Sequence, residues 1–272
     1  MIAAPPGCTW VDVTRHGPNG PQDQADHVID ECPVAIVVNG VSHVVMMATP
    51  LQVDDLAVGF MLSEGLLHHI DELRDIDVRG HTLGLEVHLD VSPRAHDRLQ
   101  QQRRQLAGRT GCGLCGIESL QAFHAGLPEA GPGGAVPAAL PLPDAGQMPE
   151  LIARALSRLP SAQALQQQTG GCHAAAWVDA SGGLTLVRED VGRHNALDKL
   201  IGARAREAAG DGAGFAMVSS RASYEMAAKC VRTGIGGLAA ISAPTSLAID
   251  LARRHGLRLW GFCRPGSVVA YA

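Results

Sequence analysis

The second half of the chain alternates short apolar strands with helices, and this order limits the fold more than any other feature of the sequence. Six strands are predicted, near residues 174–178, 184–189, 215–219, 238–242, 257–262 and 268–271. Helices are predicted over about 149–159, 193–206, 222–233 and 246–255. This alternation is typical of an α/β layer structure. With 272 residues, 46% of them hydrophobic, the chain can bury a sizeable core as one large domain or two smaller ones.

The first half carries the signals of a smaller α+β portion. Asn39-Gly40 separates two apolar runs, residues 34–38 and 41–48, which predicts a β-hairpin because both turn residues accept positive φ. Apolar and polar residues alternate strictly over 83–91, which predicts a half-buried strand. Residues 94–107, rich in Gln and Arg, predict a polar helix.

Another helix is predicted directly after the hairpin. Thr49 fits its N-cap, Pro50 fits the first helical position, and Gln52 completes a capping box. The helix is expected to end at Glu64-Gly65. Its acidic residues are expected to face solvent, namely Asp54, Asp55 and Glu64.

Composition divides the chain into four parts. Residues 1–30 are polar, contain several Pro and Gly, and are expected to be loose. Residues 31–125 are assigned to the N-terminal α+β portion, and residues 126–149 to a linker rich in proline and glycine. Residues 150–272 are assigned to the α/β core.

Charge and cysteine usage exclude several classes of function. The net charge is −5 with no basic run, so nucleic acid is not expected as a main partner. Residues 1–136 carry a net charge of −9 and residues 137–272 a net charge of +4, so the second half suits an anionic ligand better. The opening residues do not resemble a signal peptide, and no apolar run is long enough to span a bilayer. Seven cysteines at irregular spacings favour reduced thiols in the cytoplasm.

Cys112 and Cys115 stand out because glycines surround them in the stretch Arg109-Thr110-Gly111-Cys112-Gly113-Leu114-Cys115-Gly116. Glycine allows a sharp turn that leaves both sulfurs uncovered. Arg109 and the start of a helix after Gly116 would both favour a thiolate. Half of a zinc site and a structural disulfide also fit this spacing.

Polar, glycine-containing loops recur at the ends of the predicted strands in the second half. Ligands of open α/β sheets bind outside the carboxyl ends of the strands, and helix N-termini with Ser, Thr or Gly accept anions. Arg193, Arg221 and Arg264 could each hold a phosphate. Taken singly, each feature also fits an ordinary structural role, but together they favour a large polyanionic ligand. The loops are Thr169-Gly170-Gly171-Cys172-His173, Glu189 to Lys199, Ser219-Ser220-Arg221, Ser242 to Ser246, and Phe262-Cys263-Arg264-Pro265-Gly266-Ser267.

Several of these stretches together resemble the formate dehydrogenase accessory sulfurtransferase family (the FdhD family). The resemblance covers roughly residues 31 to 271. Its motifs are Asn39-Gly40, Thr49-Pro50, Asp54-Asp55-Leu56, Gly59-Phe60, Ser63-Glu64-Gly65, Cys112-Gly113-Leu114-Cys115-Gly116, Glu189 to Lys199, Ser219-Ser220-Arg221 with Glu225 and Lys229, and Ala243-Pro244-Thr245-Ser246.

The resemblance implies a sulfurtransferase of the cytoplasm. Such a protein takes persulfide sulfur from a cysteine desulfurase and passes it to the molybdenum bis(molybdopterin guanine dinucleotide) cofactor of formate dehydrogenase. Cys112 is the expected persulfide carrier and Cys115 is expected to assist. The implied fold is a cytidine-deaminase-like three-layer α/β core, with the smaller N-terminal α+β portion beside it, in a homodimer without membrane or nucleic-acid partners. The resemblance also implies cofactor binding by the last loop, Phe262 to Ser267. From the strand-end loops, Arg193, His194, Ser220, Arg221, Thr245 and Ser246 are expected to bind the cofactor as well.

Other functions compete with this one. A zinc deaminase is disfavoured, because the chain lacks His-x-Glu and has Gly111 rather than proline before Cys112. A structural zinc site could use a Cys₃His set, namely Cys112, Cys115, Cys172 and His173. Cys172 also leaves open how many thiols carry sulfur. A dithiol oxidoreductase and a cofactor chaperone without sulfur transfer remain as alternatives.

Overall fold

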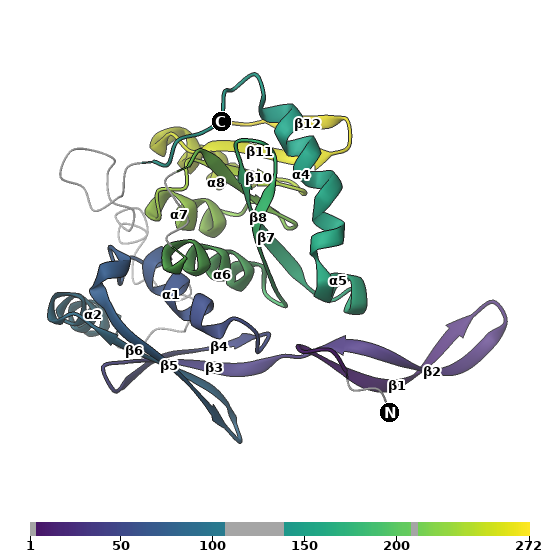
Figure 1. The fold of residues 1–272 in the computed structure, drawn as a ribbon, viewed down its shortest axis with the longest axis horizontal. Coiled ribbons are helices and arrows are strands. Elements are labelled where there is room, and N and C mark those ends of the chain that lie inside the picture. Colours follow the sequence, from purple (N-terminus) through teal and green to yellow (C-terminus); the bar gives the residue numbers. More distant parts are fainter. Residues whose placement is uncertain (1–3, 107–138, 208–211) are drawn as a thin grey trace.

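The computed structural model describes residues 4–106, 139–207 and 212–272 (Figure 1). A six-stranded sheet forms the centre of the second half, with the order β12-β11-β10-β9-β7-β8. β9, β10 and β11 run parallel to one another, β7 is antiparallel to both its neighbours, and β12 is antiparallel to β11. The strands are β7 (His173–Asp179), β8 (Leu184–Asp190), β9 (Gly214–Val218), β10 (Gly237–Ala240), β11 (Arg258–Arg264) and β12 (Ser267–Ala270).

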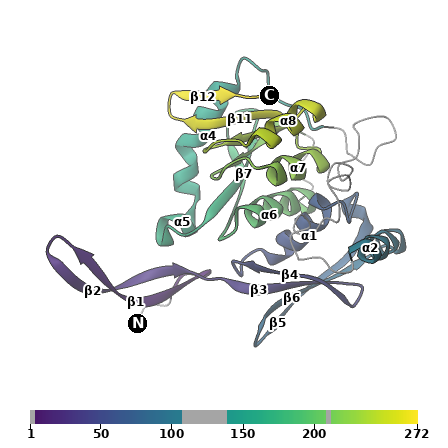
Figure 2. The ribbon, with the colours of Figure 1, turned by 180° about the vertical axis from the view of Figure 1, so that it is seen from behind.

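Helices pack on both faces of this sheet, which makes a three-layer α/β core (Figures 1 and 2). Alternate residues of β7 point to opposite faces, as strand geometry requires. Ala175 and Trp177 join one apolar cluster with α6 (Arg193–Arg206), α7 (Tyr224–Arg232) and α8 (Ser246–His255). Ala174 and Ala176 join the other cluster with α4 (Met148–Ala162). The mixed α/β class and the element order expected for the second half are therefore confirmed.

The first half folds as a four-stranded sheet with the order β4-β3-β6-β5. One face packs on α1 (Val53–Ser63) and α2 (Pro93–Leu106). The predicted hairpin is confirmed, because Asn39 and Gly40 have φ of 47° and 78° and join β3 to β4. The strands are β3 (Cys32–Val38), β4 (Val41–Ala48), β5 (Leu73–His81) and β6 (Gly84–Val91), and a short 3₁₀ turn, Ile70–Glu72, precedes β5.

Two glycines bring α1 of the first half against α6 of the core. A Cβ at Gly59 would lie 1.7 Å from the carbonyl oxygen of Asp198, and a Cβ at Gly202 would lie 1.9 Å from that of Asp55. The two helices can approach this closely only because neither residue has a side chain. The contact joins the four-stranded sheet to the core through α1.

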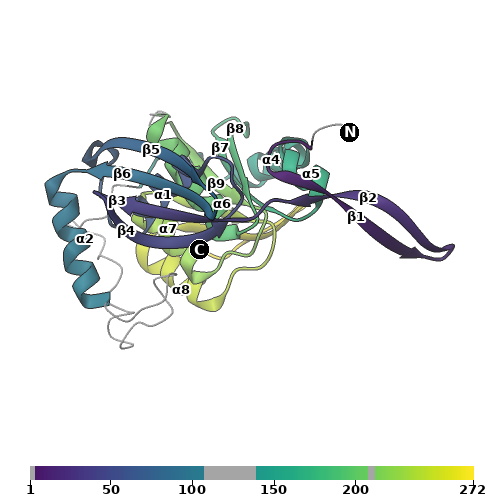
Figure 3. The ribbon, with the colours of Figure 1, turned by 90° about the horizontal axis from the view of Figure 1, so that it is seen from below.

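The N-terminal segment predicted to be loose instead forms a hairpin that projects from the body (Figure 3). β1 (Cys8–Gly17) pairs with β2 (Gly20–Ile29) along their whole length. Most of the Pro and Gly residues that suggested looseness lie at the turn or before the first strand. β1 itself contains Thr, Trp and Val, which favour strands.

The predicted start of α1 is wrong. The helix begins at Val53, and Gln52 precedes it in the left-handed region with φ 46° and no side-chain cap. Thr49 instead accepts a hydrogen bond from the amide of Val191 through its Oγ1, at 3.1 Å. The hydroxyl serves a long-range contact that local sequence patterns do not reveal. The predicted end is confirmed, with Glu64 as C-cap and Gly65 at φ 72°.

Besides β1, β2 and the 3₁₀ turn, β5 and the short helix α5 (Ala164–Thr169) were not predicted. Of the predicted linker, residues 126–138 lie outside the described residues, and residues 139–147 contain no helix or strand.

Among the described helices, none is long and apolar enough to cross a membrane.

Candidate functional site

The strand-end loops of the core meet at one edge of the six-stranded sheet, which we call the loop edge. β8 and β9 are both antiparallel to β7 and therefore run in the same direction, and β10 and β11 run parallel to β9. All four strands therefore end at this edge. The antiparallel β7 starts at the same edge, since His173 pairs with Asp190. The expectation that the five loops share one side is therefore confirmed by the register.

Backbone hydrogen bonds join three of these loops into one surface. The amide of Ser242 donates to the carbonyl of Ser220 at 3.3 Å, and the amide of Phe262 donates to the carbonyl of Ser242 at 3.1 Å. The amide of Thr245 donates to the carbonyl of Ala222 at 3.0 Å. The loops after β9, β10 and β11 are thus held in fixed relative positions.

The first turn of α6 brings Arg193 and His194 to the loop edge. Both side chains are partly exposed. His194 Nε2 lies 2.9 Å from Glu225 Oε2 in the first turn of α7. Burial lowers the pKa of His194, Glu225 opposes this effect, and Arg193 adds to it. Burial and Arg193 also lower the pKa of His173. Both imidazoles therefore take up their second proton less readily than a free histidine does.

The loops after β9 and β10 supply hydroxyls and an exposed guanidinium. Thr245 caps α8 by accepting from the amide of Ala248 at 3.3 Å, and Ser246 is exposed at the first helical position. The hydroxyl of Ser220 is buried and donates to the carbonyl of Arg221 at 3.1 Å. Arg221 is exposed at the start of the loop. Ser220 is thus a structural member of this edge, whereas Arg221 and Ser246 face solvent.

The last predicted loop, residues 262–267, is largely strand. Phe262, Cys263 and Arg264 belong to β11, Ser267 opens β12, and Pro265-Gly266 form the turn between them. Cys263 is buried and points into the core, so it cannot reach a ligand at the edge. Phe262 is 46% exposed at φ 48°, within an irregularity of the β11–β12 register. Arg264 donates to the carbonyl of Ile241.

Comparison with known proteins identifies the relatives of this chain. The model of the FdhD/NarQ family matches residues 29–272. The chain belongs to this family. It is 52% identical to the sulfur carrier protein FdhD of Chromobacterium violaceum over 97% of this chain and 95% of that protein. It is 47% identical to the protein of the same name from Burkholderia mallei, over 98% and 96%.

A solved structure has the same fold as this family member. It is a crystal structure of a "putative formate dehydrogenase accessory protein" from Desulfotalea psychrophila, with a TM-score of 0.74 and 23% sequence identity. The likeness covers 98% of this chain and 97% of that chain. At this identity the match shows a shared fold for the whole chain.

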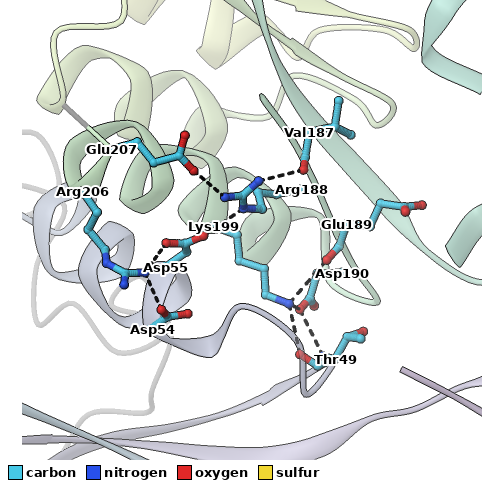
Figure 4. Close-up of polar contacts among 10 residues, drawn as sticks. All are labelled: Thr49, Asp54, Asp55, Val187, Arg188, Glu189, Asp190, Lys199, Arg206 and Glu207. Carbon is cyan, nitrogen blue, oxygen red and sulfur yellow. Dashed lines mark hydrogen bonds and ion pairs between the residues drawn. The ribbon is translucent and has the colours of Figure 1, made fainter. Parts of the chain in front are cut away.

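A buried ion pair that the sequence patterns do not reveal lies beneath the loop edge of this family member (Figure 4). Lys199 Nζ lies 2.7 Å from Asp190 Oδ2, and both side chains are fully buried. Lys199 also donates to the carbonyl of Thr49 at 3.0 Å. Burial lowers the pKa of Lys199, and Asp190 opposes this effect. The pair joins the end of β8 to the segment between β4 and α1.

A second buried cluster lies between α1, α6 and α7. Lys229 Nζ lies 2.8 Å from Glu64 Oε1 and 3.0 Å from an oxygen of Asp198. Ser63 donates to Asp198 Oδ1 at 2.6 Å. Burial acts to lower the pKa of Lys229, but Asp198 and Glu64 outweigh it and the pKa is raised. Glu64 is therefore not the solvated residue that the sequence predicted.

The expectation that Asp55 faces solvent is also wrong. Asp55 is buried and accepts from Arg188 at 2.9 Å and from Arg206 (Figure 4). Asp54 is the partly exposed partner of the same Arg206. In the sequence, acidic residues at a helix start look like a solvent-exposed face. Only the arginines of a distant segment show that Asp55 is buried in ion pairs. The charged partners come from β8 and α6, more than a hundred residues away.

The five cysteines that the structure describes are poor nucleophiles. Burial raises the pKa of the Cys230 thiol to about 12 and that of Cys263 to about 11. Cys172 donates to Glu189 at 3.2 Å, and burial followed by this carboxylate raises its pKa strongly. The pKa values of Cys8 and Cys32 are raised as well. Cys112 and Cys115 lie outside the described residues.

No metal centre is found among the described residues. They contain no group of three His, Cys, Asp or Glu side chains that could hold a metal ion. The Cys₃His zinc set considered from sequence includes Cys112 and Cys115, which the structure does not describe.

A pocket of about 460 Å³ lies elsewhere, on the four-stranded sheet. It is lined mostly by polar residues of β5 and β6, with Ile76 and Leu89, together with the Asn39-Gly40 turn. None of the predicted site residues takes part in it. The loop edge remains the candidate site, because it gathers the basic and hydroxyl side chains.

Proposed function

We propose that this chain is a sulfur carrier for the maturation of formate dehydrogenase. The observation that carries the proposal is its 52% identity, over nearly the full length of both chains, to a protein named sulfur carrier protein FdhD. The fold of a formate dehydrogenase accessory protein supports it. In the full form of the proposal, the chain is a sulfurtransferase enzyme of the cytoplasm and works as a homodimer with a cytidine-deaminase-like core.

The sulfur chemistry is assigned to Cys112. Its thiolate attacks the terminal sulfur of the persulfide of a cysteine desulfurase, the sulfur–sulfur bond of that persulfide breaks, and the desulfurase cysteine leaves as a thiolate. Cys112 then carries the persulfide, and Cys115 assists its transfer onward. Such exchange requires a thiol whose pKa is near or below its ordinary value. The raised pKa values of the other five cysteines support this assignment.

The loop edge is assigned as the binding site of the molecule that accepts the sulfur. We propose that it binds the molybdenum bis(molybdopterin guanine dinucleotide) cofactor as substrate, through its phosphates. The start of α8 offers Thr245 and Ser246, and the start of α6 offers Arg193, with no acidic residue in the first turn of either helix. Free amides and the helix dipole favour anions at both places.

Mass spectrometry tests the sulfur assignment. The protein is incubated with a cysteine desulfurase and cysteine, and the added sulfur is mapped. Cys112→Ala should lose the persulfide. A matched control replaces Cys8, Cys32, Cys230 and Cys263 by Ala or Ser, and should keep the full load. If Cys112→Ala kept the full load, the assignment would be wrong; if it lost the load but still matured formate dehydrogenase, the chain would be a cofactor chaperone.

Calorimetry with GDP, as a fragment of the cofactor, tests the loop edge. Arg193→Ala and Arg221→Ala should each weaken GDP binding by about ten- to a hundredfold, the effect of one lost charge-assisted hydrogen bond. Arg264→Ala should also weaken it, with a contribution from the lost contact to Ile241. Cys112→Ala is the control and should bind GDP normally. Unchanged binding by all three arginine variants would place the cofactor elsewhere.

A further inference from the structure

α7 differs from the other two helices that begin at the loop edge. It carries Glu225 in its first turn, whereas the first turns of α6 and α8 contain no acidic residue. A carboxylate at a helix N-terminus occupies the position that a phosphate would take. The start of α7 is therefore unsuited to the phosphates of a nucleotide, and its chemistry points to a ligand group that donates hydrogen bonds.

The Glu225 carboxylate is held in position by two neighbours. His194 Nε2 lies 2.9 Å from Glu225 Oε2, and the hydroxyl of Ser223 donates to the same oxygen at 3.3 Å. Ser223 is the N-cap residue of α7, but its side chain makes no cap hydrogen bond. The Ser223 hydroxyl therefore orients the Glu225 carboxylate instead of capping the helix. The side chain of Glu225 remains 34% exposed, so a ligand can reach it.

Among the described residues, Glu225 has no lysine or arginine paired with it, and it differs from Glu189, which also lacks such a partner, because Glu189 is buried and accepts from the amides of Leu165 and Gln166. Asp190 is paired with Lys199, and Asp198 and Glu64 are paired with Lys229. The partner of Glu225 is His194, and burial lowers the pKa of this histidine. The Glu225 carboxylate therefore has room to accept further hydrogen bonds.

Guanine is the nucleobase that a free carboxylate recognises best. Its Watson–Crick edge presents two adjacent donors, the N1–H and the 2-amino group, which match the two oxygens of one carboxylate. Adenine presents an acceptor, N1, in the equivalent place, and a carboxylate repels it. Hypoxanthine keeps the N1–H and lacks the 2-amino group.

We propose that Glu225, oriented by His194 and Ser223, selects the guanine base of the ligand bound at the loop edge. The inference rests on the proposed function, which supplies a guanine nucleotide as ligand. It assigns the phosphates to the starts of α6 and α8 and the base to the start of α7. The position is consistent with one ligand, since Ala222 next to α7 is hydrogen-bonded to Thr245 at the start of α8.

The test compares three nucleotides by calorimetry: GDP, inosine diphosphate (IDP) and ADP. The unaltered protein should bind GDP about ten- to a hundredfold more tightly than IDP, and ADP more weakly still, because one charge-assisted hydrogen bond is lost with the 2-amino group. In Glu225→Gln this preference should shrink by about tenfold, and IDP, which keeps the N1–H, should also bind more weakly but lose less affinity than GDP. Ser223→Ala keeps the Glu225 carboxylate but removes the hydroxyl that orients it. This variant should retain part of the preference for GDP over IDP.

Glu150→Gln is the matched control. Glu150 also lies in the first turn of a helix, α4, on the other face of the sheet, and its side chain is 77% exposed. This variant should keep the full preference for GDP, and circular dichroism should show that all variants are folded. Binding of GDP and IDP with equal affinity, or an unchanged preference in Glu225→Gln, would overturn the inference alone. Failure of the unaltered protein to bind any of the three would overturn the loop edge as a binding site, and the inference with it.

Discussion

At the scale of single residues, the two lysines of this chain are both buried in ion pairs. Lys199 and Lys229 are the only lysines beside twenty arginines in the sequence, and both are buried. A lysine ammonium is a compact charge, which suits the small buried site of Lys199, formed by one carboxylate and two backbone carbonyls, and that of Lys229, formed by two carboxylates and a hydroxyl, better than a planar guanidinium does. Each lysine joins the first half of the chain to the α/β core.

Replacement of Lys199 should destabilise the protein strongly. Lys199→Met leaves Asp190 buried without its cation, and loss of one partner of a buried ion pair costs about 3–5 kcal/mol. The free energy of unfolding in urea measures this effect. Arg154→Ala removes an exposed pair with Glu150 as a control and should cost less than about 1 kcal/mol. A cost for Lys199→Met as small as that of the control would show that the buried pair contributes nothing.

At the scale of the elements, the contact of α1 with α6 holds the two sheets together. Gly59 and Gly202 face the backbone of the opposite helix, and the buried clusters of Lys199 and Lys229 flank the same helix pair. Close backbone contact leaves no space for a side chain to adjust. The relative position of the two halves is therefore set by small residues and buried charges together.

A methyl group at this contact should be costly. Gly202→Ala places a Cβ 1.9 Å from the Asp55 carbonyl oxygen, so the helices must separate. Overpacking of this kind costs about 1–3 kcal/mol, and a rigid backbone neighbour favours the upper end. Gly17→Ala is the control, since a Cβ at that position would meet no described atom within 4 Å and its φ is not positive. Equal unfolding free energies for the two variants would contradict the close helix contact.

At the scale of the whole molecule, several partly buried histidines link stability to pH. Burial lowers the pKa of His68, His173, His194 and His255 below their ordinary value of about 6.5. The unfolded chain therefore binds protons more readily than the folded protein near this pH. The stability that these neutral histidines contribute is present above pH 6.5 and is lost as the pH falls below it.

The melting temperature should accordingly fall between pH 7.5 and pH 5.5. The carboxylates with lowered pKa, such as Glu64 and Glu72, lose their contribution only at lower pH, so histidines dominate this window. Scanning calorimetry across the window measures the fall. The double variant His173→Gln/His194→Gln should show a smaller fall, and His16→Gln, at an exposed site on β1, should show the same fall as the parent. A melting temperature that rises as the pH decreases would contradict the assigned direction.

Local patterns in the sequence determined most of the elements and their order. The Asn39-Gly40 turn, the strand ending at Val91, and the alternating strands and helices of the core all depend on neighbouring residues. Because the order of strands in an α/β layer places their ends together, the shared edge of the loops was also predictable. Cys112 and Cys115 were singled out by their glycines, which is likewise a local signal.

Only the tertiary structure decided which charged residues are buried and which face a ligand. Asp55, Glu64 and Lys199 look like surface charges in sequence, yet their partners lie far along the chain, and burial follows from partners rather than from composition. Cys263 was expected at the ligand-binding surface, but the register of β11 turns it into the core. Side chains alternate between the two faces of a strand, and only the packing of the folded chain determines which face is exposed to solvent.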